Sequence, residues 1–210
     1  LVRTLEDENF TVLLQPRAGL DYFSPDLDQA RKQLAAVSAL IDDIEPRNEQ
    51  SPPLLHVVSY SEAAHLATPP IINESVQITH YAIKEYRRLR RAGLVEDMSK
   101  NEDVSARTEA LLKNLRTMID AIESHVADPY SAEGFYTIFA AGFMPTPYIW
   151  AEKAEFTHAT HWMTKSLKGG VVAVDKEGNP VSSEQIAAVA IANIPAITYR
   201  LKQRNQGLIL

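Results

Sequence analysis

The stretch Thr11-Val12-Leu13-Leu14-Gln15-Pro16-Arg17-Ala18-Gly19 joins a short apolar run to a turn. Residues 11–14 predict a buried strand, and Pro16 and Gly19 are residues that end strands. Arg17 is therefore expected on the turn at the carboxyl end of a strand, where sheets with helical crossovers bind ligands. A guanidinium there is a planar fork suited to a carboxylate or a phosphate. The alternative interpretation is a surface arginine in a turn.

Helical periodicity and turn signals organise the rest of the chain. The expected helices span residues 26–45, 73–92, 102–126, 131–141 and 183–192. A second strand is expected over residues 54–60, beyond a polar, proline-rich linker at 46–53. A short helix could begin at Ser61, but Pro69-Pro70 interrupts it. Residues 171–175 and 179–182 flank a Gly-Asn turn and predict a hairpin.

The alternation of strand and helix predicts an α/β protein. We expect residues 1–100 to form a partial, TIM-barrel-like (β/α) segment that includes the linker. Residues 101–210 are expected to form a helix-rich C-terminal region with a small hairpin near 171–182. Because a full barrel takes roughly 250 residues and eight strands, this chain is expected to be completed by another chain.

Composition excludes several classes of function. The net charge is −6 at pH 7, and no basic stripe predicts a nucleic-acid partner. The densest basic cluster, residues 84–91, lies late in a predicted helix, where cations are favourable. The chain has no cysteine, which excludes thiolate nucleophiles and cysteine-ligated metals. No apolar run approaches 18 residues and no signal peptide is evident, so we expect no membrane span and a cytoplasmic location.

Three blocks of the sequence match motifs of one enzyme family. They are Gln15-Pro16-Arg17-Ala18-Gly19; Glu62-Ala63 followed by Thr68; and residues 110–187, which carry Gly142-Phe143-Met144 and Gly178-Asn179. Together they resemble the epsilon subunit of methylaspartate mutase, also called glutamate mutase. The resemblance implies a barrel chain that sits over a separate cobalamin-binding subunit. It also implies an adenosylcobalamin-dependent radical isomerase that interconverts glutamate and 3-methylaspartate.

The resemblance implies roles for particular residues. Arg17 and Gln15 would bind the carboxylate of an amino acid or a related acid, and Thr68 and Met144 would lie near adenosylcobalamin. Because the chain has no Asp-x-His-x-x-Gly motif, the lower axial ligand would come from a cobalamin-binding partner subunit. An oligomer is expected, with that subunit or with a chain that completes the barrel.

Residues near the end of the second predicted strand form a candidate acid/base group. Glu62 and His65 stand three residues apart just beyond that strand, and Tyr60 lies at its end. This placement favours general acid/base catalysis. The alternative is a glutamate at a helix start with an incidental histidine.

Two differences from the family keep other hypotheses open. One helix and the linker replace a long middle section, and the family's Thr-Lys-Glu is Thr68-Pro69-Pro70 here. The chain could therefore be a cofactor-free acid/base enzyme derived from that family. It could also be a non-catalytic assembly subunit that completes a partner's barrel, since an incomplete set of strands leaves edges that need pairing.

The C-terminal region offers two weaker signals. His158 and His161 share one face if their segment is helical, and with Glu152, Glu155 or a distant carboxylate they could hold a metal. The alternatives are solvated or hydrogen-bonded histidines, or His161 as a general acid/base, and we predict no metal site. The stiff, aromatic loop at 142–148, together with Trp150, could wall a pocket, face a partner subunit or pack in a core.

Overall fold

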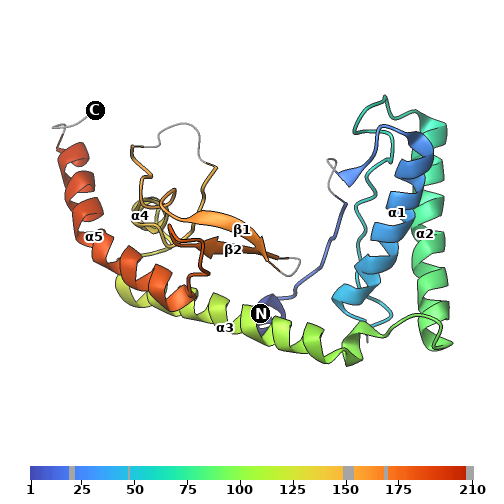
Figure 1. Cartoon of the computed structure of the whole chain (residues 1–210), viewed down its shortest axis with the longest axis horizontal. Coiled ribbons are helices and arrows are strands. Elements are labelled where there is room, and N and C mark those ends of the chain that lie inside the picture. Colours follow the sequence, from blue (N-terminus) through green and yellow to red (C-terminus); the bar gives the residue numbers. More distant parts are fainter. Residues whose placement is uncertain (19–21, 47, 149–153, 168–169, 207–210) are drawn as a thin grey trace. The chain divides into compact units, whose positions relative to one another are not determined.

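A computed structural model describes residues 1–18, 22–46, 48–148, 154–167 and 170–206 (Figure 1). The chain divides into two compact units, Leu1–Arg107 and Thr108–Leu210, and each is described by itself. With 54% helix and two strands in one sheet, the described chain is of the mixed α/β class that the sequence predicts. No TIM barrel is evident in the described residues.

The first unit alternates extended segments with long helices. An N-terminal 3-10 turn, η1 (Val2–Leu5), leads into extended residues 11–18, which precede α1 (Leu27–Ile41) and the 3-10 turn η3 (Asp42–Ile44). Extended residues 54–59 then lead to α2 (Pro69–Arg91), and η4 (Met98–Lys100) follows. The two extended segments pair in parallel at one bridge, between Arg17 and His56. The order and pairing are those of a βαβα crossover.

The two strands predicted at residues 11–14 and 54–60 are wrong as regular strands. Both segments are extended, but their pairing is limited to the bridge, where the backbone N–H of His56 donates to the carbonyl of Pro16 at 3.2 Å. A strand requires a run of ladder hydrogen bonds to a neighbour. The described residues supply no third segment to pair with either of these two.

Helices α1 and α2 lie side by side and run in the same direction (Figure 1). Three levels of contact show this. Near the helix starts, Arg31 Nε donates to Glu74 at 2.8 Å. In the middle, the hydroxyls of Ser38 and Thr79 are 3.2 Å apart. At the ends, Asp42 binds arginines of the last turns of α2. The core beneath the pair is formed by Ala18, Phe23, Ala30, Leu34, Val58 and Tyr60.

Local signals explain where these two helices begin. The side chain of Asp26 accepts the backbone N–H of Gln29 at 2.8 Å, which caps α1. Pro69 and Pro70 occupy the first turn of α2, where proline is favourable because the missing N–H would have no partner. The expectation that these prolines interrupt a helix is wrong, since they begin one. Residues 61–64 form turns instead of the predicted short helix.

The second unit contains three helices and a hairpin. Its helices are α3 (Glu102–His125), which starts before the unit boundary, α4 (Ala132–Ala141) and α5 (Ser183–Asn205). The apolar core consists of Val126, Ile138, Ala140, Ala141, Phe143, Ala190 and Ile197. Gly142 ends α4 with φ of +94°, and a Cβ there would lie 2.8 Å from the carbonyl oxygen of His158. A glycine is thus required both by conformation and by space.

The hairpin differs from its prediction in one strand. Strands β1 (Met163–Leu167) and β2 (Gly170–Val174) pair antiparallel, with Met163 opposite Val174. The predicted turn at 176–179 does form, because Asp175 Oδ1 accepts the N–H of Asn179 at 2.8 Å. Beyond it, the chain makes only a single bridge, between Val174 and Pro180. No helix among the described residues has the length and apolar character needed to cross a membrane.

Candidate functional site

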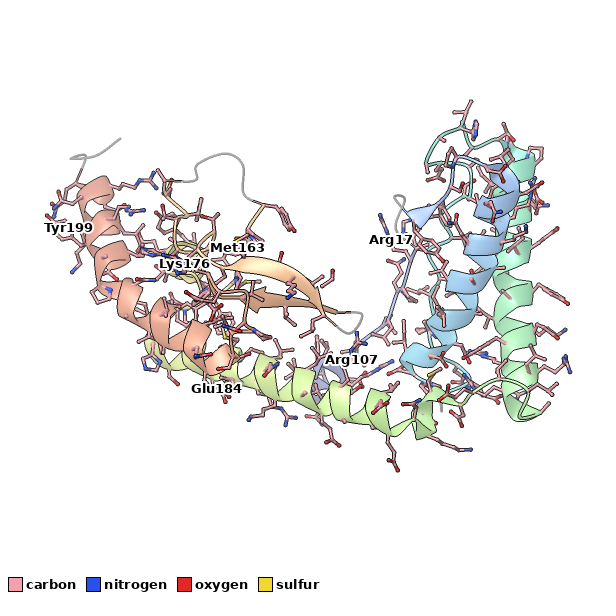
Figure 2. The ribbon with its side chains drawn as sticks, in the orientation of Figure 1. Arg17, Arg107, Met163, Lys176, Glu184 and Tyr199 are labelled. Atoms are coloured by element: carbon pink, nitrogen blue, oxygen red, sulfur yellow. The ribbon has the colours of Figure 1, made fainter. Side chains whose placement is uncertain are left out.

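Arg17 lies where the two extended segments of the first unit meet. It is exposed, and Figure 2 shows it on the segment that precedes α1. Its guanidinium makes no hydrogen bond or ion pair with any described residue, and the same holds for the exposed amide of Gln15. The neighbouring Ala18 is buried in the core, which anchors the segment. Gly19, the last residue of the motif, lies outside the described residues. Arg17 therefore presents a guanidinium that no described residue binds, at the point where the two extended segments pair in parallel.

Tyr60 lies in the core of the same unit and has two polar partners. The side chain is 1% exposed. Its hydroxyl donates to Glu74 Oε2, and the Arg31 guanidinium carbon lies 4.7 Å from the centre of its ring. Arg31 also binds the other oxygen of Glu74. A tyrosine, a glutamate and an arginine from three segments thus form one group, the Tyr60–Glu74–Arg31 cluster.

Electrostatics within this cluster hold each group in its usual charge state. Burial, followed by the bond to Glu74, raises the pKa of the Tyr60 phenol above its ordinary value. Hydrogen bonds from Arg31 and then from Tyr60 lower the pKa of the Glu74 carboxyl. Near neutral pH the tyrosine is therefore protonated and the glutamate is charged. In that state Tyr60 can donate a hydrogen bond but is a poor general base.

Glu62 and His65 are exposed on the turns that follow Tyr60. Glu62 accepts the backbone N–H of Ser59 at 3.2 Å, and His65 Nε2 lies 3.0 Å from the carbonyl oxygen of Pro25. The structure brings them to one turn region but not into a hydrogen bond with each other or with Tyr60. Both side chains remain open to a solute from outside.

The two residues expected near a cofactor fall in different units. Thr68 precedes α2 as its N-cap, is half-buried, and makes no side-chain cap hydrogen bond, so its hydroxyl is not used by the helix. Met144 follows Gly142 in the second unit and is 46% exposed. Phe143 beside it is 1% exposed and belongs to the core, which is the packing interpretation of this aromatic loop. Trp150 lies outside the described residues.

The histidines of the second unit do not form a metal centre in the described residues, where no three His, Asp or Glu side chains gather. Burial, followed by the charge of Arg200, lowers the pKa of His158. Glu155 instead accepts a hydrogen bond from the hydroxyl of Tyr136 at 2.6 Å and forms an ion pair with Arg204. Glu152 lies outside the described residues.

Sequence reasoning missed the partners of Tyr60. Arg31 and Glu74 stand on α1 and α2 among other charged residues, and neither lies in a motif. The available signal was weak: both positions fall in the first two turns of helices that flank the Tyr60 segment. Only the parallel packing of the two helices brings them together.

No family model, curated protein or solved structure matches this chain. The resemblance to the methylaspartate mutase epsilon subunit therefore depends on the short motifs alone.

Proposed function

We propose that this chain is a component of a glutamate-mutase-like, adenosylcobalamin-dependent carbon-skeleton isomerase that acts on an amino acid or a related carboxylic acid. In this proposal its first unit is part of a TIM-barrel-like array that another chain completes. The observation that carries the proposal is the exposed Arg17 at the parallel bridge with His56, whose guanidinium has no hydrogen bond or ion pair to a described residue. Each of the paired segments leads to a helix, as in a (β/α) unit, and ligands bind at the carboxyl ends of such segments.

In this proposal, residues of the first unit divide the work of binding and proton transfer. Arg17 would hold a carboxylate through two charge-assisted hydrogen bonds, and the Gln15 amide would add a third donor. Glu62 and His65 would exchange protons with the substrate from the turn after the second segment. Tyr60 would act as a positioning residue, because its hydroxyl is given to Glu74 and its ring is enclosed.

Cobalamin would be held mainly by a partner subunit. When bound, it supplies the radical that starts isomerisation. From this chain, Thr68, whose hydroxyl makes no cap hydrogen bond to α2, and the exposed Met144 would each contact the cofactor. The chain's own task is then to bind and orient the acid and to move its protons.

The test is reconstitution of the protein with the cobalamin-binding small subunit of a glutamate mutase. Adenosylcobalamin absorbance reports cofactor binding, and L-glutamate serves as the substrate probe. We expect cofactor binding that depends on both chains, and Arg17→Ala should raise the KM for glutamate about tenfold or more. Arg88→Ala is the matched control, since Arg88 is 59% exposed and, among the described residues, hydrogen-bonds only to Glu85. No cofactor binding with the small subunit would refute the proposal.

Turnover without cobalamin would instead assign the cofactor-free acid/base enzyme. Pro69 and Pro70 at the start of α2 favour that outcome, because they put no polar side chain where the resembling family has Lys and Glu. Glu62→Gln and His65→Gln should then each lower kcat at least a hundredfold, in line with general acid/base catalysis.

A second candidate function is assembly without catalysis. Residues 11–18 and 54–59 share one bridge, and the described residues offer their remaining backbone groups no strand partner. Unpaired edges of this kind are covered in stable proteins. Amide hydrogen exchange would show protection of both segments only in the presence of the completing chain. An active complex that loses turnover with Arg17→Ala would exclude this candidate.

A further inference from the structure

A pocket of about 440 Å³ lies in the first unit between the second half of α2 and residues 49–55. It shares no lining residue with the site around Arg17. Its polar wall comes from one face of α2, where His80, Lys84, Arg87 and Arg91 recur at helical spacing. Pro52, Leu55 and Ile83 supply apolar surface. The pocket thus combines a cationic wall with an apolar part.

The position of Arg87 is fixed by the buried side chain of Asp42 and by two backbone carbonyls. Its Nε donates at 2.5 Å to Asp42, whose side chain is 2% exposed. Its Nη1 and Nη2 donate to the carbonyls of Glu49 and Ser51, at 2.9 and 3.0 Å. A guanidinium has five N–H donors, so two of them have no partner among the described residues. Arg87 therefore presents a pre-organised fork with spare donors in the lining of the pocket.

Two further cations at the pocket are free to move. Lys84 is exposed and has no ion pair with a described residue. Arg91 pairs with Glu49, but their side chains are 63% and 68% exposed. An exposed pair contributes little and is readily exchanged for another anion. By contrast, the pair of Asp42 with Arg87 and Arg90 is enclosed and stays intact.

We propose that this pocket binds an organic phosphate monoester. A phosphate dianion matches the mobile Lys84 and Arg91 cations together with the fixed Arg87 fork, and it displaces Glu49 from Arg91. The apolar body of the ligand lies against Pro52, Leu55 and Ile83. A carboxylate has half the charge and fewer acceptor sites, so it satisfies this set of donors less well.

The test uses phenyl phosphate as the probe, with isothermal titration calorimetry on the whole chain at low salt. We expect saturable binding at one site, with weaker binding of inorganic phosphate, which lacks an apolar body, and of benzoate, which has one charge. Lys84→Ala should weaken phenyl phosphate binding about tenfold. Arg88→Ala removes the same charge from the same helix outside the pocket and should change affinity less than twofold.

A gain of affinity gives the sharper test. Glu49→Gln removes the acid that competes for Arg91, and it should tighten phenyl phosphate binding about threefold. Glu85→Gln breaks the comparable Arg88 pair outside the pocket and should leave affinity unchanged. Circular dichroism confirms that each exposed variant keeps its helix content. Absence of saturable binding, equal binding of benzoate, or equal effects of the Arg88 and Lys84 variants would overturn the proposal.

Discussion

Each unit contains a cluster of one tyrosine, one glutamate and one arginine. The two clusters differ in which side chain is most shielded from water. In the first unit the ring of Tyr60 is 1% exposed while Glu74 is 41% exposed. In the second unit Tyr136 is half-buried and its partner Glu155 is only 15% exposed. In both clusters the arginine binds the acid and lies over the tyrosine ring. Its guanidinium carbon is 4.7 Å from the ring centre for Arg31 and 5.8 Å for Arg204.

The difference concerns which part of each cluster water can reach. Glu74 can exchange a lost hydrogen bond for water, whereas Glu155 has fewer such replacements. Asp42, at 2% exposed and bound by Arg87 and Arg90, is the extreme case. The loss in free energy of unfolding when one of these groups is mutated should therefore depend on how well the acid is shielded from water. Burial of its aromatic or cationic partner should matter less. Three of the four predictions below test that ranking, and the deletion of an apolar core side chain gives a reference cost without an acid.

The largest effect is expected at Asp42. Asp42→Asn leaves Arg87 without its carboxylate partner and leaves Arg90 with only the longer pair to Asp43 at 3.4 Å, both in an enclosed setting, and it should lower the free energy of unfolding by about 3–5 kcal/mol. Hydrogen exchange of α1 and α2 peptides measures this loss. Asp28→Asn is the control, because Asp28 is 86% exposed in its pair with Arg31; its cost should stay below about 0.5 kcal/mol. Equal costs for the two variants would break the ranking.

An apolar deletion gives the comparison in the second unit. Ile197 is 0% exposed in the core between α5 and its neighbours. Ile197→Ala should cost about 2–5 kcal/mol through lost burial and a cavity. Both tryptophans of the chain lie in this unit, so fluorescence during urea unfolding follows it. Val189→Ala, at a side chain 41% exposed on the same helix, should cost less than half as much.

The two tyrosines test the comparison directly. Tyr136→Phe should cost about 1.5–3 kcal/mol, since it removes a hydrogen bond to the enclosed, charged Glu155. Tyr60→Phe should cost about 0.5–1.5 kcal/mol, because water can reach Glu74. Hydrogen exchange of peptides from each unit measures both variants in the same way. The reverse order would show that burial of the ring governs the cost.

The smallest effect is a pH dependence in acid. The folded pKa of Glu74 is lowered, first by Arg31 and then by Tyr60. Its stabilisation is therefore present above the unfolded glutamate pKa of about 4.3 and is lost as pH falls through the lower folded value. The free energy of unfolding of the first unit should decrease across that window. Glu74→Gln should flatten this decrease, and an unchanged slope would mean that other carboxyls carry it.

Sequence patterns predicted the helices better than the strands. Caps at Asp26, Ser131 and Ser182 are visible in the sequence and are formed in the structure. The last helix continues past its predicted end at residue 192, although Pro195 lies inside it. Packing of Ile197 in the core offsets the backbone bond that a proline removes. β1 was missed because Met163–Leu167 shows no apolar alternation.

Some residues of the candidate sites could be predicted from the sequence, whereas others are recognised only in the structure. Arg17, Gln15, Glu62 and His65 were found from a motif and from their positions after apolar runs, and the structure leaves all four exposed. The Tyr60–Glu74–Arg31 cluster and the pocket beside Arg87 could not be predicted from motifs or apolar runs. Their members come from segments 14 to 45 residues apart in the chain. No local pattern records such a contact.

Local chemistry in the sequence determines the helices and their caps, because propensity, capping and proline geometry act over a few residues; Arg17, expected on a turn, lies instead in an extended segment at the bridge with His56. Tertiary structure decides that α1 and α2 lie parallel, and hence that Asp42 meets Arg87 and that Glu74 meets both Arg31 and Tyr60. It also decides that two apolar runs remain extended with a single bridge. The physical reason is that burial and charge pairing depend on which segments meet, and a strand exists only when another segment pairs with it.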